Sequence, residues 1–197
     1  MYSSLSLALI ASVSMTAAAG IAYQDVVVDF DDQPGGLPGV PTDGAFSEHV
    51  TFSTDQNHQL LILSGSDFIG GSGPNSLSAV DSAGKIFDGD IYMDFTGPVQ
   101  NVSFDVLADN DQGTIAMISV AHSGGVSFFD VVGNGDFTDP IFFDFSDLMD
   151  VTSIELTGIT DEFGLGVDNL AFSVPVPTPS TMALMGLGLM TVCRRNR

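Results

Sequence analysis

Aspartate is the residue type of this chain that is best suited to chemistry. The chain carries 25 Asp and Glu residues against 4 Lys and Arg, and its only glutamates are Glu48, Glu155 and Glu162. Asp favours turns and helix caps, and its carboxylate is a frequent oxygen ligand of Ca²⁺. The composition therefore predicts a bound calcium ion. It fits equally well an acidic surface suited to salty water, or a loop-rich all-β domain whose turns favour Asp.

One acidic segment has calcium-like spacing. Residues 109–113 read Asp-Asn-Asp-Gln-Gly, which supplies the spaced oxygens and the glycine of half a calcium loop. The third ligand and the distant Glu of a complete loop are missing, so a hairpin turn is the preferred interpretation. His49, His58 and His122 show no metal-ligand spacing and are interpreted as incidental surface or sheet residues.

No catalytic pattern stands out. The aspartates are so many that no particular pair is marked as the two carboxylates of a glycosidase. The chain has no Gly-x-Ser-x-Gly nucleophile elbow and no phosphate-cradling loop ahead of a helix. Its only cysteine, Cys193, lies near the C-terminus, so the body can form no disulfide. We therefore predict a protein that is not an enzyme.

The body of the chain is almost purely anionic. Lys85 is the only basic residue outside the C-terminal cluster. Binding to phosphate backbones requires clustered Lys and Arg that displace counterions, so nucleic acid is excluded as a direct partner.

The elements that must position these residues are β-strands. Runs of β-branched and aromatic residues, bounded by Gly, Asp, Asn and Pro, predict an all-β domain over residues 20–174, a length sufficient for one core. The predicted strands are residues 25–30, 49–53, 59–63, 90–96, 99–107, 114–122, 126–132, 140–145, 151–157 and 166–174. Their short spacing favours an antiparallel two-sheet β-sandwich of jelly-roll type.

The connections and the core follow from the same pattern. Residues 35–41 and 64–74 are rich in Gly, Ser and Pro and predict long surface loops, while Ser123-Gly124-Gly125 predicts a hairpin. Aromatic side chains are expected to fill the space between the sheets, among them Phe104, Phe128, Phe142 and Phe172.

The N-terminus carries an export signal. Residues 5–15 are apolar and are followed by Thr16-Ala17-Ala18-Ala19-Gly20, with small residues where signal peptidase cuts. We predict a signal peptide over residues 1–19, export through the Sec machinery and cleavage by signal peptidase. An uncleaved N-terminal anchor is the alternative.

The C-terminus has three parts. Residues 175–181 form a Pro/Thr stem, residues 182–193 are apolar, and the chain ends in the basic cluster of residues 194–197. The X-Pro pattern favours an extended spacer, and the basic end is expected to stay in the cytoplasm. A dozen helical residues reach roughly 18 Å, against about 30 Å of hydrocarbon core, so the transmembrane segment is short for a permanent anchor.

This tail resembles the PEP-CTERM sorting signal of bacteria. Val176, Pro177, Thr178, Pro179 and Ser180 occupy the motif, with Thr178 where the family has Glu, and Arg194, Arg195 and Arg197 form the closing cluster. The resemblance implies that an exosortase, a membrane-embedded cysteine peptidase or transpeptidase, processes the chain. It implies transient membrane anchoring followed by display on the cell surface or in the extracellular matrix. A lifelong tail anchor and a GPI signal are the alternatives.

The body resembles, more loosely, galactose-binding-like jelly rolls and related carbohydrate-binding modules. Residues 26–32 and 164–172 are similar to the first and last strands of these folds. The resemblance implies a structural Ca²⁺ held by Asp31 and Asp168, with Asp29, Asp32 and Asn169 as lesser candidates. Ca²⁺ takes six to eight oxygens, so backbone carbonyls or water must complete the set.

Together these features predict an exported, noncatalytic cell-surface or extracellular-matrix protein. The alternative is a calcium-dependent carbohydrate-binding module that acts on extracellular polysaccharide. Sugar faces stack on Trp and Tyr. The chain has no Trp, and Tyr92 is the only Tyr well inside the domain.

Overall fold

The computed structural model describes residues 21–36, 40–64, 75–81, 88–107, 111–136, 139–161 and 164–176. Tyr23–Val176 forms one compact unit. Met1–Ala22 and Pro177–Arg197 form the other unit, which lies outside the described residues apart from Ile21 and Ala22. The predicted signal peptide and transmembrane segment fall in that second unit and stay predictions.

The described part of the chain consists of β-strands and connections, without a helix. The strands are β1 (Ala22–Val28), β2 (Val40–Pro41), β3 (Val50–Thr54), β4 (His58–Ser64), β5 (Asn75–Asp81), β6 (Ile91–Leu107), β7 (Gln112–His122), β8 (Gly125–Asn134), β9 (Ile141–Asp144), β10 (Val151–Thr157) and β11 (Gly166–Val176). The strand pairs whose register is defined are antiparallel. The predicted all-β antiparallel sandwich is confirmed.

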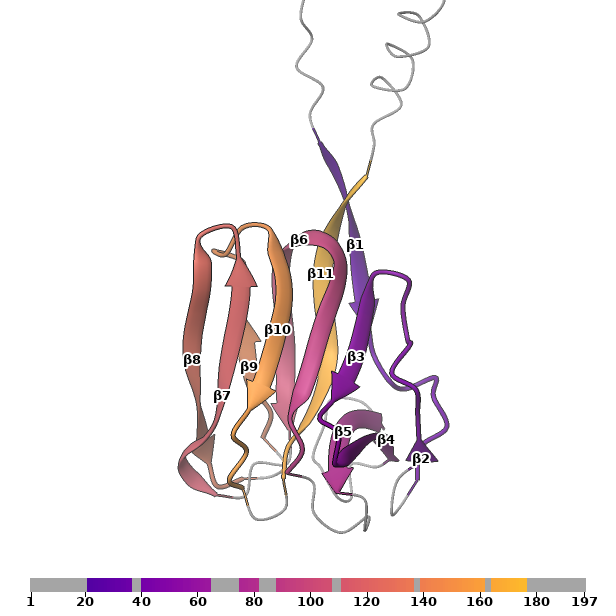
Figure 1. Ribbon diagram of the computed structural model, residues 1–197, viewed down its shortest axis with the longest axis vertical. Helices are drawn as coiled ribbons and strands as arrows, with labels where there is room; N and C mark the ends of the chain where they lie inside the picture. The colour runs from indigo at the N-terminus through magenta and orange to yellow at the C-terminus, as the bar shows by residue number, and fades with distance from the viewer. Residues whose placement is uncertain are drawn as a thin grey trace, which may run out of the picture. The chain divides into compact units, whose positions relative to one another are not determined.

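The strands lie in two layers (Figure 1). The front layer contains β3, the first half of β6, β10, β7 and β8, in that order. The back layer contains β2, β4, β5, β11, the second half of β6 and β9, and β1 pairs with β11. The first and last strands are therefore neighbours.

Strand β6 joins the two layers. Residues 91–95 pair with β3 in the front layer, and residues 100–107 pair with β11 in the back layer. The chain turns between the layers at Thr96, Gly97 and Pro98, which are all exposed. Pro98 has no N–H to leave unpaired at this corner. The two predicted strands, 90–96 and 99–107, are thus one element that changes sheet.

Alternation along the strands builds one core between the layers. In β6, Ile91 and Met93 are fully buried, while Tyr92 is half-buried and Asp94 is exposed. Phe104 and Phe172 lie in the core as predicted, and the Phe172 ring lies 5.0 Å from the Phe95 ring.

Two of the predicted core aromatics point the other way. Phe128 and Phe142 are each 64% exposed, and their neighbours Phe129 and Phe143 pack against the core instead. Each pair is an adjacent Phe-Phe doublet, and successive residues of a strand face opposite sides of the sheet. The prediction that Phe128 and Phe142 fill the core is therefore wrong, because the register selects the second member of each doublet.

Two strands were missed. β5 and β2 pair with β4 on either side of it, whereas residues 35–41 were expected as loop and no strand was expected at 75–81. Residues 75–80 of β5 are all buried. β5 reads Asn-Ser-Leu-Ser-Ala-Val-Asp, and with Val80 as its only β-branched residue and no aromatic residue its sequence lacks the usual strand signal.

Candidate functional site

Asp168 is a buried carboxylate at the centre of the back layer. It lies on β11 directly opposite Asp105 of β6, and it is only 1% exposed. Its Oδ1 accepts the backbone N–H of Asn169 at 2.8 Å, but its Oδ2 has no hydrogen-bond partner. Asn169 has a φ of 52° and donates from Nδ2 to Asp105 Oδ2 at 2.9 Å. A buried oxygen without a partner is costly, and it invites a cation or a proton.

Other aspartates act on this group through their charge. Burial raises the pKa of Asp168 to about 6, and Asp31, Asp105 and Asp29 add to the rise. We call Asp29, Asp31, Asp105 and Asp168 the acidic cluster. Two of the other predicted ligands, Asp31 and Asp29, thus act on Asp168 through their charge. Asn169 is hydrogen-bonded to Asp105, and Asp29, Asp31 and Asp32 are all exposed.

Asn75 holds the loop that carries Asp31. Its buried side-chain Nδ2 donates to the carbonyl oxygens of Phe30 and Gln33, at 2.9 and 2.8 Å. Its backbone N–H donates to Asp31 Oδ1 at 3.4 Å. The start of β5 therefore fixes the segment after β1 beside the acidic cluster.

A second buried oxygen without a partner belongs to Ser76, on the strand that pairs with β11. Ser76 Oγ is buried, and it neither donates nor accepts a hydrogen bond. Ser76 precedes Leu77, and Leu77 pairs with Val167, the residue before Asp168. Sequence reasoning missed Ser76 and Asp105, because neither residue belongs to a motif and the sheet alone brings them to Asp168.

The acidic cluster meets part of the requirement for Ca²⁺. Within the described ranges, no three His, Cys, Asp or Glu side chains lie close enough together to hold a metal ion. A hard cation at Asp168 therefore requires hydroxyl, amide, carbonyl or water oxygens beside the carboxylates. The two orphaned oxygens, Asp168 Oδ2 and Ser76 Oγ, are the available donors that fit such an ion.

His58 is held between two carboxylates. Its Nδ1 lies 2.7 Å from Asp55 Oδ2, and its Nε2 lies 3.1 Å from Asp88 Oδ1. Burial lowers the pKa of His58, but the hydrogen bonds and charges of Asp55 and Asp88 together outweigh it and raise the pKa above its ordinary value. The hydrogen bond to His58 lowers the pKa of Asp55. His58 is thus a clamp that ties Asp55 to Asp88, and not an incidental residue.

Replacing His58 by Gln is expected to weaken the fold most at mildly acidic pH. A raised histidine pKa stabilises the fold fully below the ordinary value of about 6.5, and this contribution is lost as pH rises through the raised value. Urea unfolding should show a loss of about 1–2 kcal/mol at pH 5.5 and a clearly smaller loss at pH 9. His49→Gln is the matched control, because the partner of His49, Glu48, is 87% exposed. If the loss in free energy of unfolding for His58→Gln does not change with pH, His58 does not stabilise the fold through its charge interactions with Asp55 and Asp88.

A serine and a histidine also lie in contact on the β7–β8 hairpin. His122 Nε2 lies 3.0 Å from Ser127 Oγ, and His122 Nδ1 accepts the Gly124 backbone N–H at 3.1 Å. Because Nδ1 accepts, a neutral His122 carries its proton on Nε2 and donates it to Ser127. In this tautomer His122 cannot take the proton of Ser127, so the pair does not form a nucleophile and base.

The outer surface of the front layer carries a row of side chains that crosses all five strands. Tyr92 lies opposite Ser53 on one side and Glu155 on the other, and Ser119 lies between Glu155 and Phe128. Ser119 Oγ donates to Glu155 Oε2 at 3.2 Å. We call these five residues the cross-strand row. An aromatic ring stands near each end of it, with a carboxylate and a hydroxyl between them.

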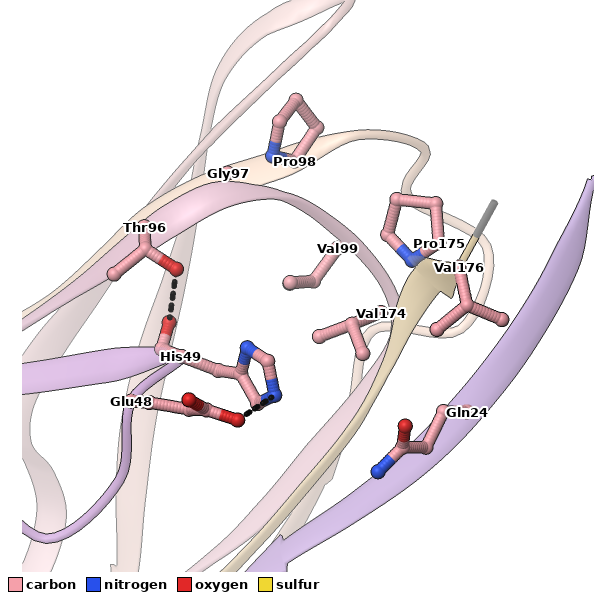
Figure 2. A pocket seen from close by; sticks show the side chains of 10 residues that line it. All are labelled: Gln24, Glu48, His49, Thr96, Gly97, Pro98, Val99, Val174, Pro175 and Val176. Carbon is pink, nitrogen blue, oxygen red and sulfur yellow. Dashed lines mark hydrogen bonds and ion pairs between the residues drawn. The ribbon is translucent and has the colours of Figure 1, made fainter. Parts of the chain in front are cut away.

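A pocket lies where β11 ends (Figure 2). This terminal pocket has a volume of about 250 Å³. Its walls come from β1 (Gln24), the segment before β3 (Glu48 and His49), the corner of β6 (residues 96–99) and the end of β11 (residues 174–176). His49 Nε2 lies 3.5 Å from Glu48 Oε1, and the Thr96 N–H donates to the His49 carbonyl oxygen at 2.9 Å. The corner of β6 is thereby tied to the segment before β3.

The predicted sorting residues lie almost wholly outside this part of the chain. Val176 is the last described residue and the end of β11. Pro177, Thr178, Pro179, Ser180, Arg194, Arg195 and Arg197 lie beyond the described residues. Within the described ranges, no helix has the length and apolar character needed to span a membrane.

Comparisons with known proteins identify the tail and the fold. The model of the PEP-CTERM protein-sorting motif matches residues 175–197, so the predicted sorting signal is confirmed. No curated protein sequence matches this chain.

Several solved structures are similar to the body. The K2 cleaved adhesin domain of Lys-gingipain is 13% identical with a TM-score of 0.50, over 77% of this chain and 100% of that chain. The module TmCBM61, solved in complex with β-1,4-galactotriose, is 13% identical with a TM-score of 0.41, over 76% of this chain and 99% of that one. A family 35 carbohydrate-binding module from Clostridium thermocellum is 16% identical with a TM-score of 0.38, over 76% and 97%. The likeness to the adhesin domain supports the β-sandwich fold.

Proposed function

We propose that this chain is an exported, noncatalytic cell-surface or matrix protein that is sorted through its C-terminal tail. The Sec machinery exports it, signal peptidase removes residues 1–19, and the tail holds the β-sandwich at the membrane. An exosortase-type peptidase then cuts the tail, and the domain is displayed or released.

One observation carries this proposal. The match to the PEP-CTERM motif begins at residue 175, and the last strand of the sandwich ends at Val176. A folded domain is therefore followed at once by a sorting signal. The tautomer of His122 supports a noncatalytic body, because it removes a Ser–His pair as a nucleophile.

Removing the basic end is expected to block processing. Arg194, Arg195 and Arg197 hold the end of the tail in the cytoplasm, so their joint replacement by Ala should leave most of the protein as a membrane-bound precursor. Immunoblots of membrane and extracellular fractions measure this. Lys85→Ala is the control, because Lys85 is the basic residue outside the cluster. Mass spectrometry of the mature native protein should find a chain without Arg197, and an intact Arg197 in most molecules overturns the sorting proposal.

Carbohydrate binding is the second candidate function, and the cross-strand row favours it. Tyr92 and Phe128 stand three strand spacings apart, about 14 Å, with Glu155 and Ser119 between them. Aromatic rings can stack on sugar faces, and the carboxylate accepts hydrogen bonds from sugar hydroxyls. The described residues include no Lys or Arg, so a neutral polysaccharide fits this surface better than an anionic one.

Truncating either ring of the row is expected to weaken binding of a neutral oligosaccharide about tenfold, which corresponds to about 1.4 kcal/mol. A glycan array, run with and without Ca²⁺, identifies the oligosaccharide, and calorimetry compares Tyr92→Ala and Phe128→Ala with the parent protein. Phe142→Ala is the matched control, because Phe142 is as exposed as Phe128 but lies on the back layer. If no glycan binds, or if Phe142→Ala loses as much affinity as the two variants of the row, the cross-strand row is not a carbohydrate-binding surface.

A structural calcium ion at the acidic cluster is part of the same proposal. Asp31 and Asp168 are its leading ligands, with Asp29, Asp32 and Asn169 as lesser candidates. The orphaned Asp168 Oδ2 supports this site, because a cation there compensates a buried negative charge.

A further inference from the structure

The front layer ends in an open strand edge. β8 pairs with β7 along its whole length, and no other strand of the described residues pairs with it. Figure 1 shows β8 as the outermost strand of the front layer. The two-residue turn makes His122 and Gly125 the first hydrogen-bonded pair of the hairpin, and such pairs alternate along an antiparallel ladder. Val126, Phe128 and Asp130 therefore direct their N–H and C=O groups away from β7, to the open edge.

This edge lacks the features that usually protect one. Proteins blunt exposed edges with short strands, proline, lysine or a bulge. β8 is ten residues long and reads Gly-Val-Ser-Phe-Phe-Asp-Val-Val-Gly-Asn, without proline or a basic residue. The register shift of the hairpin lies between Thr114 and Ala116, on β7 and not on the edge strand. By contrast, β2 at the end of the back layer has two residues, of which one is Pro41. β8 can therefore accept a further strand.

The outer face of β8 specifies which side chains an added strand should carry. Val126, Phe128 and Val132 are 55%, 64% and 57% exposed, and Asp130 is exposed between Phe128 and Val132. Side chains that lie directly opposite on neighbouring strands contact each other, and a positive charge opposite Asp130 is favourable. An antiparallel partner should therefore carry, at every second position, one apolar residue, a Lys or Arg, and two further apolar residues.

Charge distinguishes a second copy of this chain from a different protein. The described residues contain no Lys or Arg, so a second copy offers no described cation to Asp130. A second copy also adds another anionic body, and the two bodies repel each other. A basic segment is attracted by the same field. The open edge therefore fits a cationic segment of another protein.

We propose that β8 binds an extended segment of another protein, with alternating apolar and basic side chains, which adds as a strand to the front layer. Backbone hydrogen bonds at the open edge hold the segment, and its side chains contact Val126, Phe128, Asp130 and Val132. This inference depends neither on the sorting of the chain nor on a bound glycan.

A short peptide tests the proposal. The nine-residue peptide Thr-Val-Thr-Lys-Thr-Val-Thr-Val-Thr places its Lys opposite Asp130 in an antiparallel register, and fluorescence anisotropy measures its binding to the full chain in detergent. Exchanging the Lys with the Thr before it moves the charge to the other face without changing the composition. We expect this control peptide to bind about tenfold more weakly. Equal binding of the two peptides overturns the proposal.

Variants of β8 locate the binding edge. Val126→Pro removes an N–H that points to the open edge and leaves the hydrogen bonds to β7 in place, whereas Val126→Thr keeps the N–H. We expect an affinity loss of about tenfold for Val126→Pro and a change of less than about twofold for Val126→Thr. If Val126→Pro folds and binds the peptide as the parent does, β8 is not the binding edge.

A charge reversal provides a test that does not depend on the folding of the proline variant. Asp130→Lys should prefer the peptide with Glu in place of Lys, because the opposite charges are then restored. A continued preference for the Lys peptide overturns the proposal.

Two further measurements separate this edge from the other surfaces and partners. Tyr92→Ala should weaken glycan binding at the cross-strand row and leave peptide binding unchanged, so that the failure of one function is distinguishable from the failure of the other. Sedimentation velocity measures self-association. A dimer that Val126→Pro dissociates identifies a second copy as the occupant of the edge and overturns the choice of a basic partner.

Discussion

Replacing Asp168 by Asn raises the free energy of unfolding at pH 7 in EDTA by about 3 kcal/mol. The side chain keeps its shape and loses a charge that burial and the neighbouring aspartates disfavour. A pKa of about 6 in the folded protein, against an ordinary value of 3.8, corresponds to about 3 kcal/mol at neutral pH.

The sign follows from proton linkage. An acid with a raised pKa in the folded state destabilises the fold as pH rises. The free-energy cost of keeping the ionised Asp168 carboxylate buried is absent below the ordinary pKa of 3.8. It grows as pH rises toward about 6 and is fully present above that value. Urea unfolding is therefore measured from pH 4 to pH 8. As pH rises through this window, the free energy of unfolding of the parent protein should fall below that of Asp168→Asn.

Calcium separates a cation site from a merely strained carboxylate. If Ca²⁺ binds at Asp168, adding it at 100 times its dissociation constant stabilises the parent by about 2.7 kcal/mol and stabilises Asp168→Asn far less. Asp130→Asn is the control, because Asp130 is exposed on β8 of the front layer and is not a candidate ligand. Equal effects of Ca²⁺ on parent and Asp168→Asn remove Asp168 from the cation site. A loss of stability for Asp168→Asn in EDTA contradicts the raised pKa itself.

Replacing Phe172 by Ala is expected to destabilise the fold by about 3–5 kcal/mol, because truncating a buried aromatic ring leaves a cavity. Phe172 is 2% exposed on β11, and its ring lies 5.0 Å from the Phe95 ring across the core. Urea or thermal unfolding measures the loss. In the native host, the variant should also expose the end of β11 to proteolysis.

The control for Phe172→Ala is the same truncation at Phe128. Phe128 is 64% exposed, so its replacement should change the free energy of unfolding by no more than about 0.5 kcal/mol. Equal losses in the two variants contradict the register that turns Phe128 outward.

Much of the strand pattern could be predicted because its signals are local. β10 has the predicted bounds, residues 151–157, and its buried Val151, Ile154 and Leu156 alternate with polar residues. The hairpin at Ser123 and Gly124 was also predictable, because a two-residue connection joins His122 to Gly125. These features depend on side-chain period and turn chemistry, which a linear sequence carries.

The face of the sheet to which a side chain points, and whether that side chain is buried, could not be predicted in the same way. The doublets Phe128-Phe129 and Phe142-Phe143 offer either member to the core, and only the pairing of each strand with its neighbour decides between them. β5 was missed for a different reason, since its residues include one β-branched side chain, Val80, and no aromatic ring to mark a strand.

The residues of the candidate cation site also include some that the sequence predicted and some that it did not. Asp31 and Asp168 were predicted from the resemblance of the terminal strands to jelly rolls, and the structure places their charges within reach of each other. Asp105 and Ser76 belong to other strands, and no sequence signal connects them to Asp168. The orphaned oxygens and the raised pKa of Asp168 come from this assembly alone.

The sequence by itself determined that the chain is acidic, all-β and followed by a sorting signal, because composition, side-chain period and a short terminal motif are properties of neighbouring residues. The tertiary structure decided which Phe faces the core and which carboxylate is buried. It also decided that Pro175 and Val176 belong to the domain. These features depend on contacts between residues far apart in the chain, such as Asp105 with Asp168 and β1 with β11, and a linear pattern cannot supply them.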